Sequence, residues 1–404
     1  MQYVTGIIGI IGILAIAFTL STARKSINPR TVFGALAIQL IFAFIVLKWE
    51  FGRTIIQYLS GVVQKVIDSS NAGIQFLFGG LLNVEGVGFT FAFQVLPIII
   101  FFASLISILY YLGIMQFATR VIGGLLAKAL KTSNTESMSA AANIFLGPTE
   151  APLVVKPYIE KMTKSELFAV MVGGMACVSG AVLGGYATLG VPLNYLLAAA
   201  FMGAPAGLLF AKIIVPQTEN IDFQNSVVMV KDEESRNIVD AASRGAMDGL
   251  KIAVGVGTLL LAFISLIFLM NTIIGSVGGV FGFESLSLEQ ILGYLFFPLA
   301  VLMGIPWDEA LQAASFIGQK IVLNEFVAYI SFTDVIATLS PKSVAMITFA
   351  LCGFANIAAM AMLIGGLGAM APSRRQDIAE LGFRAIVAAT LANLMSAAIA
   401  GMLV

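Results

Sequence analysis

The chain has 404 residues, of which 59% are hydrophobic and only 11% charged, with equal numbers of acidic and basic residues. Its mean hydropathy of +0.98 excludes an ordinary soluble domain of this length and indicates a membrane protein. The formal net charge is zero, and no basic, aromatic-rich stripe points to a nucleic-acid partner.

Apolar runs and helix breakers predict eight membrane-spanning helices. The N-terminus enters an apolar run with no basic segment before it, so we expect a first span there rather than a cleaved signal peptide. A Gly/Pro turn at 190–194 divides the charge-free run 167–211 into two spans. The expected spans are 3–20, 32–48, 91–113, 166–188, 193–212, 248–272, 343–365 and 383–402.

The distribution of basic residues predicts that both termini lie outside. With this orientation, all Lys and Arg residues fall in cytoplasmic segments except Lys48, Arg53, Lys65, Lys320 and Lys342. This bias is what the positive-inside rule describes.

Two stretches, 134–162 and 306–338, are apolar but interrupted at their centres by polar residues, which is typical of re-entrant hairpins. Each follows a segment expected to lie in the membrane interface, at 115–131 and 288–303. The order of span, interfacial segment, hairpin and two spans therefore occurs twice. An odd number of crossings separates the two copies, so they form an inverted repeat, a recurring transporter plan.

The repeats predict the division of the chain. We expect N-terminal helices and an interfacial segment at 1–90, a first repeat at 91–212, a cytoplasmic linker at 213–247 and a second repeat at 248–404. Aligning Ser165 with Ser343 places Cys177 and Val178 opposite Ala355 and Asn356. Cys177 and Cys352 lie in apolar runs and are expected to be buried, with no disulfide or metal site.

Two glutamates at the hairpin centres are the main functional candidates, because an ionisable side chain at membrane depth is costly. Residues 147–152 read G-P-T-E-A-P around Glu150, and residues 323–327 read L-N-E-F-V around Glu325. The alternative is that each glutamate pairs with a basic neighbour such as Lys320 or lies at a half-helix N-terminus.

The chemistry of these groups limits the solute. Carboxylates accept hydrogen bonds from hydroxyl and N–H groups and attract cations, whereas an anionic solute would call for Arg, which neither hairpin contains. Amides at Asn143, Asn324 and Asn356 suit the same neutral, polyhydroxylated or heterocyclic solutes.

The sequence contains no histidine, which disfavours enzymatic function through His-dependent proteolysis or His-ligated metals. If protons are coupled to transport, Glu150 and Glu325 are the candidates. A channel or facilitator of the same fold is the alternative function. An intramembrane enzyme would need a nucleophile and base pair that the sequence does not offer.

Three motifs resemble those of the concentrative nucleoside transporter family, over nearly the whole chain. Residues 318–329 read G-Q-K-I-V-L-N-E-F-V-A-Y and match that family's G-x-K-x-x-x-N-E-F-V-A-Y signature. Residues 143–153, N-I-F-L-G-P-T-E-A-P-L, resemble its first hairpin tip. Residues 352–356, C-G-F-A-N, resemble its motif in the span after the second hairpin.

The resemblance implies cation-coupled import of nucleosides across the cytoplasmic (inner) membrane by a homotrimer, with scaffold helices and a moving transport domain. It implies that the nucleobase contacts Thr149, Glu150 and Val182, and that the ribose contacts Glu325 and Asn356. It also implies a sodium site, with no other cofactor, at Asn143, Leu146, Thr149, Cys177 and Val178.

Three departures from the family pattern fall inside the expected site. Pro148 replaces a glutamine that contacts the base, and Ala358-Ala359 replace a Ser-Ser pair on the ribose side, so Pro148 and Ala359 stand at expected substrate positions. Cys177 stands where many members have a hydroxyl residue. Because sulfur is a poor ligand for a hard cation, H+ remains an alternative to Na+ as the coupling ion.

Overall fold

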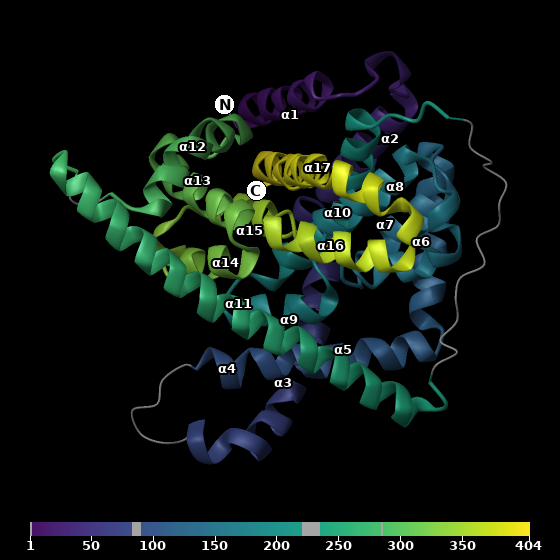
Figure 1. The fold of residues 1–404 in the computed structure, drawn as a ribbon, viewed down its shortest axis with the longest axis horizontal. Helices are drawn as coiled ribbons and strands as arrows, with labels where there is room; N and C mark the ends of the chain where they lie inside the picture. Colours follow the sequence, from purple (N-terminus) through teal and green to yellow (C-terminus); the bar gives the residue numbers. More distant parts are fainter. Residues whose placement is uncertain (1, 83–89, 220–234, 284–285) are drawn as a thin grey trace.

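The computed structural model describes residues 2–82, 90–219, 235–283 and 286–404, and these residues form helices with no strand among them. Figure 1 shows the helices and the grey traces of the remaining residues. The central part of the predicted linker, 220–234, which includes Lys231, lies outside the described residues. The predicted all-α class is confirmed.

The N-terminal part differs from the prediction in one element. Its helices are α1 (Gln2–Thr19), η1 (Arg24–Ser26), α2 (Pro29–Leu47) and α3 (Glu50–Leu82). The first two expected spans correspond to α1 and α2. By contrast, α3 is a continuous helix of 33 residues where the sequence indicated only an interfacial segment.

The first repeat contains the expected elements. The second arm of its hairpin forms a 3-10 helix instead of an α-helix. Its elements are α4 (Phe91–Gln94), α5 (Leu96–Tyr111), α6 (Ile114–Leu130), α7 (Asn134–Ala142), η2 (Ala151–Lys161), α8 (Lys164–Ala176), α9 (Gly180–Thr188) and α10 (Leu193–Ile214). Pro152 and Pro157 lie in η2. Since each proline removes a backbone donor, a regular α-helix is disfavoured there. Gly190, with φ of 101°, makes the predicted turn before α10.

The second repeat begins with a longer helix than predicted. Its elements are α11 (Ile238–Val280), α12 (Leu288–Met303), α13 (Trp307–Val322), α14 (Glu325–Thr333), η3 (Ile336–Thr338), α15 (Pro341–Leu351), α16 (Ile357–Met370), η4 (Pro372–Arg374) and α17 (Arg375–Leu403). The expected span 248–272 is the middle of α11. Asn237 caps this helix by accepting from the Asp240 N–H group, so the helix starts there.

Two expected spans are broken in the middle. The span 166–188 divides into α8 and α9 at 177–179, and the span 343–365 divides into α15 and α16 at 352–356. Both pairs of residues that the repeat alignment places opposite one another lie in these breaks. Within the described residues, six helices are long and apolar enough to cross a bilayer, or seven if α12 and α13, bent by 120°, are one span. Because α1 is shorter and α15 and α16 are separate, they fall below that length.

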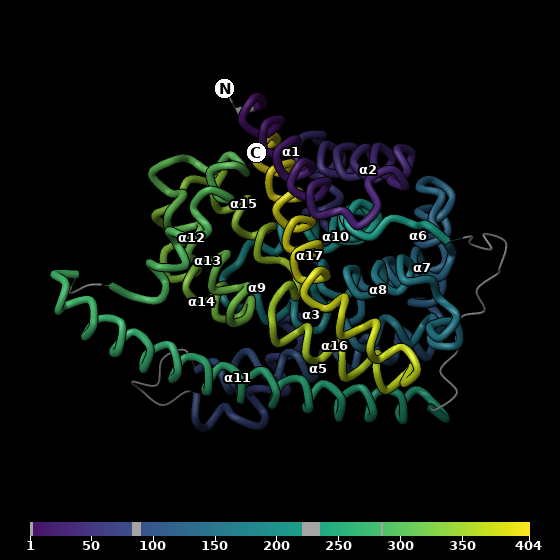
Figure 2. The backbone as a smooth tube through the Cα atoms, turned by 45° about the horizontal axis from the view of Figure 1, so that its top comes forward, coloured from purple at the N-terminus to yellow at the C-terminus, as the bar shows by residue number. Residues whose placement is uncertain are grey.

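The helices form an inner and an outer group (Figure 2). In the inner group, the buried share of the most apolar stretch is 94% for α8–α9, 89% for α10 and 83% for α17. In the outer group it is 28% for α2, 22% for α4–α5 and 11% for α11. The same packing relations occur in both repeats: α6 packs on α7 as α12 does on α13, and α8 packs on α10 as α15 does on α17. The two repeats meet where α10 contacts α17.

Candidate functional site

The tip of the second hairpin places Glu325 in a buried polar cluster. Asn324 caps α14, its side chain accepting from the Val327 N–H group at 2.9 Å. Glu325, which is 4% exposed, is therefore the first residue of α14. Its Oε2 accepts from Asn356 Nδ2 at 2.9 Å, and its Oε1 accepts from the Tyr186 hydroxyl at 3.0 Å. The structure thus brings together the two residues that the resemblance assigns to the ribose.

Asn356 is held by the helix that it starts. Its Oδ1 accepts from the Ala359 N–H group at 2.7 Å, which is an N-cap of α16. The amide plane is therefore fixed with its NH2 group toward Glu325. Ala359 is fully buried, and it contributes its backbone to this cap.

Tyr186 of α9 is a site residue that the sequence reasoning missed. Its ring lies 4.7 Å from the ring of Phe326 and 4.6 Å from that of Tyr329, both on α14. A buried tyrosine usually finds a partner for its hydroxyl, so a tyrosine in a charge-free span was the available signal. Val182 is one helical turn earlier in α9 and is also buried, which places it on the same face as Tyr186.

Lys320 does not pair with Glu325. Its Nζ instead donates to Asn393 Oδ1 at 2.6 Å and to the Ala350 carbonyl at 2.8 Å. The other half of the alternative reading does match the structure, because Glu325 begins α14 and lies where a helix dipole favours negative charge.

The tip of the first hairpin is a turn between α7 and η2. Glu150 Oε2 accepts from the Gly147 N–H group at 3.2 Å, and the side chain is half-buried. Pro148 lies against α8, because a Cβ atom added to Gly174 of α8 would be only 3.2 Å from the Cα atom of Pro148. Thr149 lies against α16, because a Cβ atom added to Gly366 of α16 would be only 3.0 Å from the Cγ2 atom of Thr149. The tip therefore contacts helices of both repeats.

The expected cation ligands of the first hairpin lie in the turn between α7 and η2. Asn143, 1% exposed, donates from Nδ2 to the Ser139 carbonyl at 2.8 Å, while its buried Oδ1 has no hydrogen-bond partner among the described residues. Leu146 and Thr149 follow in the turn. The Phe145 carbonyl accepts from the Gly180 N–H group at 3.0 Å, which ties the turn to the break at 177–179.

Comparison with known proteins gives three consecutive family matches. The description "Na+ dependent nucleoside transporter N-terminus" matches residues 8–81, "Nucleoside recognition" matches 92–193, and "Na+ dependent nucleoside transporter C-terminus" matches 195–401. The last match alone covers half of the chain. The chain belongs to the concentrative nucleoside transporter family.

Relatives of this transporter are similar over its whole length. It is 53% identical to the "Uncharacterized transporter YutK" of Bacillus subtilis, with all of both chains covered. It is 49% identical to the "Nucleoside permease NupC" of Helicobacter pylori, over 98% of this chain and 97% of the relative. It is 37% identical to human "Solute carrier family 28 member 3", over 98% of this chain and 59% of the relative.

Solved structures agree with the fold. CNTnw in an inward-facing substrate-bound state has a TM-score of 0.95 and 52% identity, covering 100% of this chain and 98% of that chain. A CNTnw variant in an outward-facing state gives the same values. The protein is thus a Na+-dependent nucleoside transporter of several membrane-crossing helices, and not an enzyme.

The departures of this transporter from the family pattern have distinct surroundings. The Cys177 sulfur faces α10, since a Cβ on Gly203 would be 2.6 Å from it. The Cys177 carbonyl accepts from the Phe354 N–H group at 3.3 Å. Val178 is buried in the same break. At this break the cysteine sulfur is therefore directed at α10, and the Cys177 carbonyl is directed at the other break.

Proposed function

We propose that the protein imports nucleosides across the cytoplasmic membrane together with Na+, and that Glu325 and Asn356 bind the ribose. The observation that carries this proposal is the carboxylate of Glu325. It has about four lone-pair positions, of which Tyr186 and Asn356 each use one. The remaining positions suit a vicinal diol, whose two hydroxyl groups donate.

The first hairpin reads the nucleobase in this proposal. Glu150 supplies acceptors, Thr149 a hydroxyl group and Val182 an apolar surface, while Pro148 offers no side-chain donor. We therefore expect a preference for bases that present N–H donors to the tip. Ala359 itself adds no side-chain hydroxyl group to the ribose side.

The proposed cation site uses Asn143 Oδ1, the Thr149 hydroxyl group and main-chain oxygens near Leu146, Cys177 and Val178. Its support is the unpaired Asn143 Oδ1, because a buried amide oxygen without a partner is costly. Oxygen ligands are those that a hard cation prefers. H+ is the alternative coupling ion.

Movement in this proposal is of an elevator type, within a homotrimer. The parts are N-terminal scaffold helices at 1–90, the repeats at 91–212 and 248–404, and the linker at 213–247, with both termini outside. The support is the contrast between the buried helices α8, α10 and α17 and the exposed apolar surface of α11.

The test is uptake of labelled uridine, adenosine and guanosine into proteoliposomes under separately imposed Na+ and H+ gradients. We expect accumulation above the outside concentration with an inward Na+ gradient. Accumulation driven only by the H+ gradient would show that H+, and not Na+, is the coupling ion. Uptake that follows the solute gradient but never exceeds it under either cation would identify a facilitator and overturn the proposal.

A further inference from the structure

Asn393 of α17 is a buried side chain that contacts both helix breaks. Its Nδ2 donates to the Ala176 carbonyl at 2.8 Å and to the Cys352 carbonyl at 3.2 Å. Ala176 ends α8, and Cys352 directly follows α15. Carbonyls at helix ends lack intrahelical partners. One amide group therefore satisfies an unpaired carbonyl in each of the two repeats.

Lys320 fixes the orientation of this amide. Its Nζ donates to Asn393 Oδ1 at 2.6 Å and to the Ala350 carbonyl in the last turn of α15 at 2.8 Å. Lys320 is fully buried, and a cation is stabilised at a helix C-terminus. Since only an oxygen can face the ammonium group, the NH2 group of Asn393 must face the two breaks.

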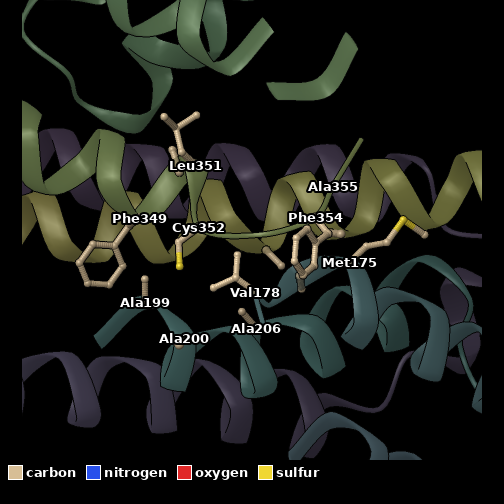
Figure 3. Close-up of a cluster of buried hydrophobic side chains, with 14 of the residues drawn as sticks. Met175, Val178, Ala199, Ala200, Ala206, Phe349, Leu351, Cys352, Phe354 and Ala355 are labelled. Atoms are coloured by element: carbon tan, nitrogen blue, oxygen red, sulfur yellow. The ribbon is translucent and has the colours of Figure 1, made fainter. Parts of the chain in front are cut away.

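The two breaks are also in direct contact. The Phe354 N–H group donates to the Cys177 carbonyl at 3.3 Å, and Figure 3 shows the segment with Cys352, Phe354 and Ala355 running past Val178. A Cβ on Gly353 would be 2.4 Å from Asn393 Oδ1. No free space separates these groups, so a displacement of one break must also displace the other.

We propose that Asn393, held by Lys320, is a positioning residue that couples the cation site to the ribose site. The inference rests on the proposed function, which places cation ligands at 177–178 and the ribose ligand Asn356 at the end of the other break. Asn393 acts through the carbonyls that it binds. A cation that orders 177–178 thereby orders 352–356, and with it the contact between Asn356 and Glu325.

This coupling has a measurable form. If Na+ raises the affinity for nucleoside by some factor, nucleoside must raise the affinity for Na+ by the same factor. Couplings of this kind are typically about 5- to 150-fold. A residue with only a structural role changes both affinities without changing this factor, whereas a coupling residue changes the factor itself.

The test variant is Asn393→Asp, which keeps the shape and an oxygen toward Lys320 but has no N–H group for the two carbonyls. Binding of labelled nucleoside to purified protein in nanodiscs is measured without Na+ and at saturating Na+. We expect the wild-type coupling factor to fall to about twofold or less in the variant. The Na+ concentration for half-saturation should lose its dependence on nucleoside in parallel.

The matched control is Ser396→Ala, one turn further along α17. Ser396 is buried, and its hydroxyl group donates to the Ala392 carbonyl of its own helix, its one partner in the described part of the chain. Its coupling factor should equal that of the wild type. If Asn393→Asp does not fold, the double variant Lys320→Met/Asn393→Leu removes the polar pair with little change of volume, and it should lose coupling as well.

The outcomes separate this inference from the proposed function. If the nucleoside affinity of the wild-type protein is the same with and without Na+, the proposed sodium coupling is contradicted. A wild-type protein that shows coupling, with an Asn393→Asp variant that keeps the same factor, overturns the role of Asn393 alone. If neither variant folds, the role of Asn393 is structural and the inference is also overturned.

Discussion

At the scale of single residues, the proposed ribose site is built from acceptors and donors that orient one another. Asn356 is fixed by its N-cap bond, Tyr186 by its tilted ring contacts with α14, and Glu325 by its hydrogen bonds with both of them. Such preorganisation reduces the ordering cost of binding. It also makes each polar atom sensitive to substitution.

We expect Glu325→Gln to lower kcat/KM for nucleoside uptake by about 10- to 100-fold, because hydrogen bonds to a charged group are worth about 1.5–3 kcal/mol. The glutamine amide would also direct a donor at Tyr186 or Asn356, both of which donate here. Uptake into proteoliposomes measures the effect, with the exposed Glu380→Gln as control. Near-normal uptake by Glu325→Gln would remove Glu325 from the site.

Tyr186→Phe should keep the ring contacts with Phe326 and Tyr329 but lose the hydroxyl group that donates to Glu325. We expect the nucleoside KM to rise about tenfold, again the size of one charge-assisted hydrogen bond. The measurement is KM at saturating Na+, compared with that of Tyr195→Phe on α10. Equal KM values in the two variants would show that the hydroxyl group has no part in binding.

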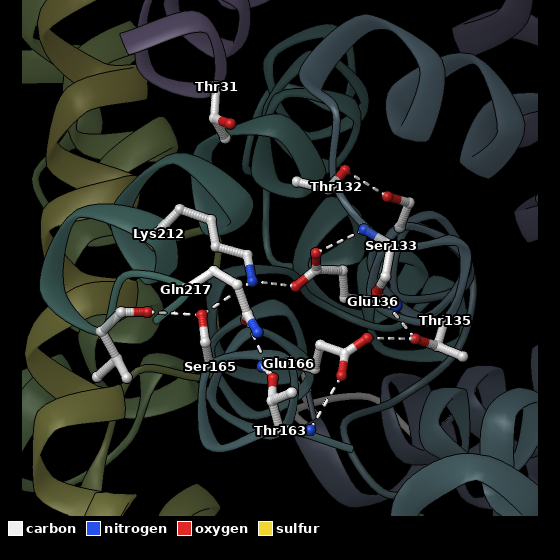
Figure 4. A network of polar contacts seen from close by, with 12 residues as sticks. Thr31, Thr132, Ser133, Thr135, Glu136, Thr163, Ser165, Glu166, Lys212 and Gln217 are labelled. Atoms are coloured by element: carbon white, nitrogen blue, oxygen red, sulfur yellow. Dashed lines mark hydrogen bonds and ion pairs between the residues drawn. The ribbon is translucent and has the colours of Figure 1, made fainter. Parts of the chain in front are cut away.

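At the scale of elements, a buried ion pair holds the first hairpin to the core (Figure 4). Lys212 Nζ of α10 lies 2.5 Å from Glu136 Oε2 of α7 and donates to Ser165 Oγ of α8 at 2.9 Å. Glu136 also closes a capping box with Ser133, which starts the hairpin helix. Three elements of the first repeat are therefore joined at one charge.

Lys212→Met should destabilise the protein by about 3–5 kcal/mol, because it leaves the Glu136 carboxylate buried without its partner. The double variant Glu136→Gln/Lys212→Met should recover part of this loss. Denaturant unfolding of the purified protein measures both. Lys251→Met, which breaks the exposed pair with Asp248, should cost less than about 1 kcal/mol. An equal cost for the buried and exposed pairs would contradict this account.

At the scale of the whole molecule, the basic residues predict the orientation of the protein in the membrane. Lys48 and Lys25 are both exposed, and the positive-inside bias places them on opposite sides. The native cysteines, Cys177 and Cys352, are each 1% exposed and are expected not to react with a polar reagent.

We therefore expect a membrane-impermeant maleimide to label Lys48→Cys, but not Lys25→Cys, in right-side-out membrane vesicles. Both variants should be labelled once the vesicles are opened with detergent, which controls for reactivity. Wild-type protein should stay unlabelled under both conditions. If Lys25→Cys alone is labelled in intact vesicles, the protein has the opposite orientation to the one proposed.

Much of the fold was predictable because the bilayer restricts the choices. Spans, hairpins and their double occurrence follow from the lengths of apolar runs and the positions of Gly, Pro and polar residues. The helix breaks at 177–179 and 352–356 did not follow, although the repeat alignment paired their residues. The length of α3 was also missed, because its sequence alternates apolar and polar groups and contains no long apolar run.

Hydropathy and three motifs were enough to predict the class of protein and the family. The two hairpin glutamates were also predictable, since a charge inside an apolar chain is visible without a structure. Only the tertiary structure decided the partners of those charges. Tyr186 and Glu325 are 139 positions apart, and Lys320 and Asn393 are 73 positions apart. A buried tyrosine hydroxyl or asparagine amide needs a hydrogen-bond partner, but the local sequence does not show which distant residue supplies it. Their roles arise from the register in which the inner helices pack, which is a property of the whole fold.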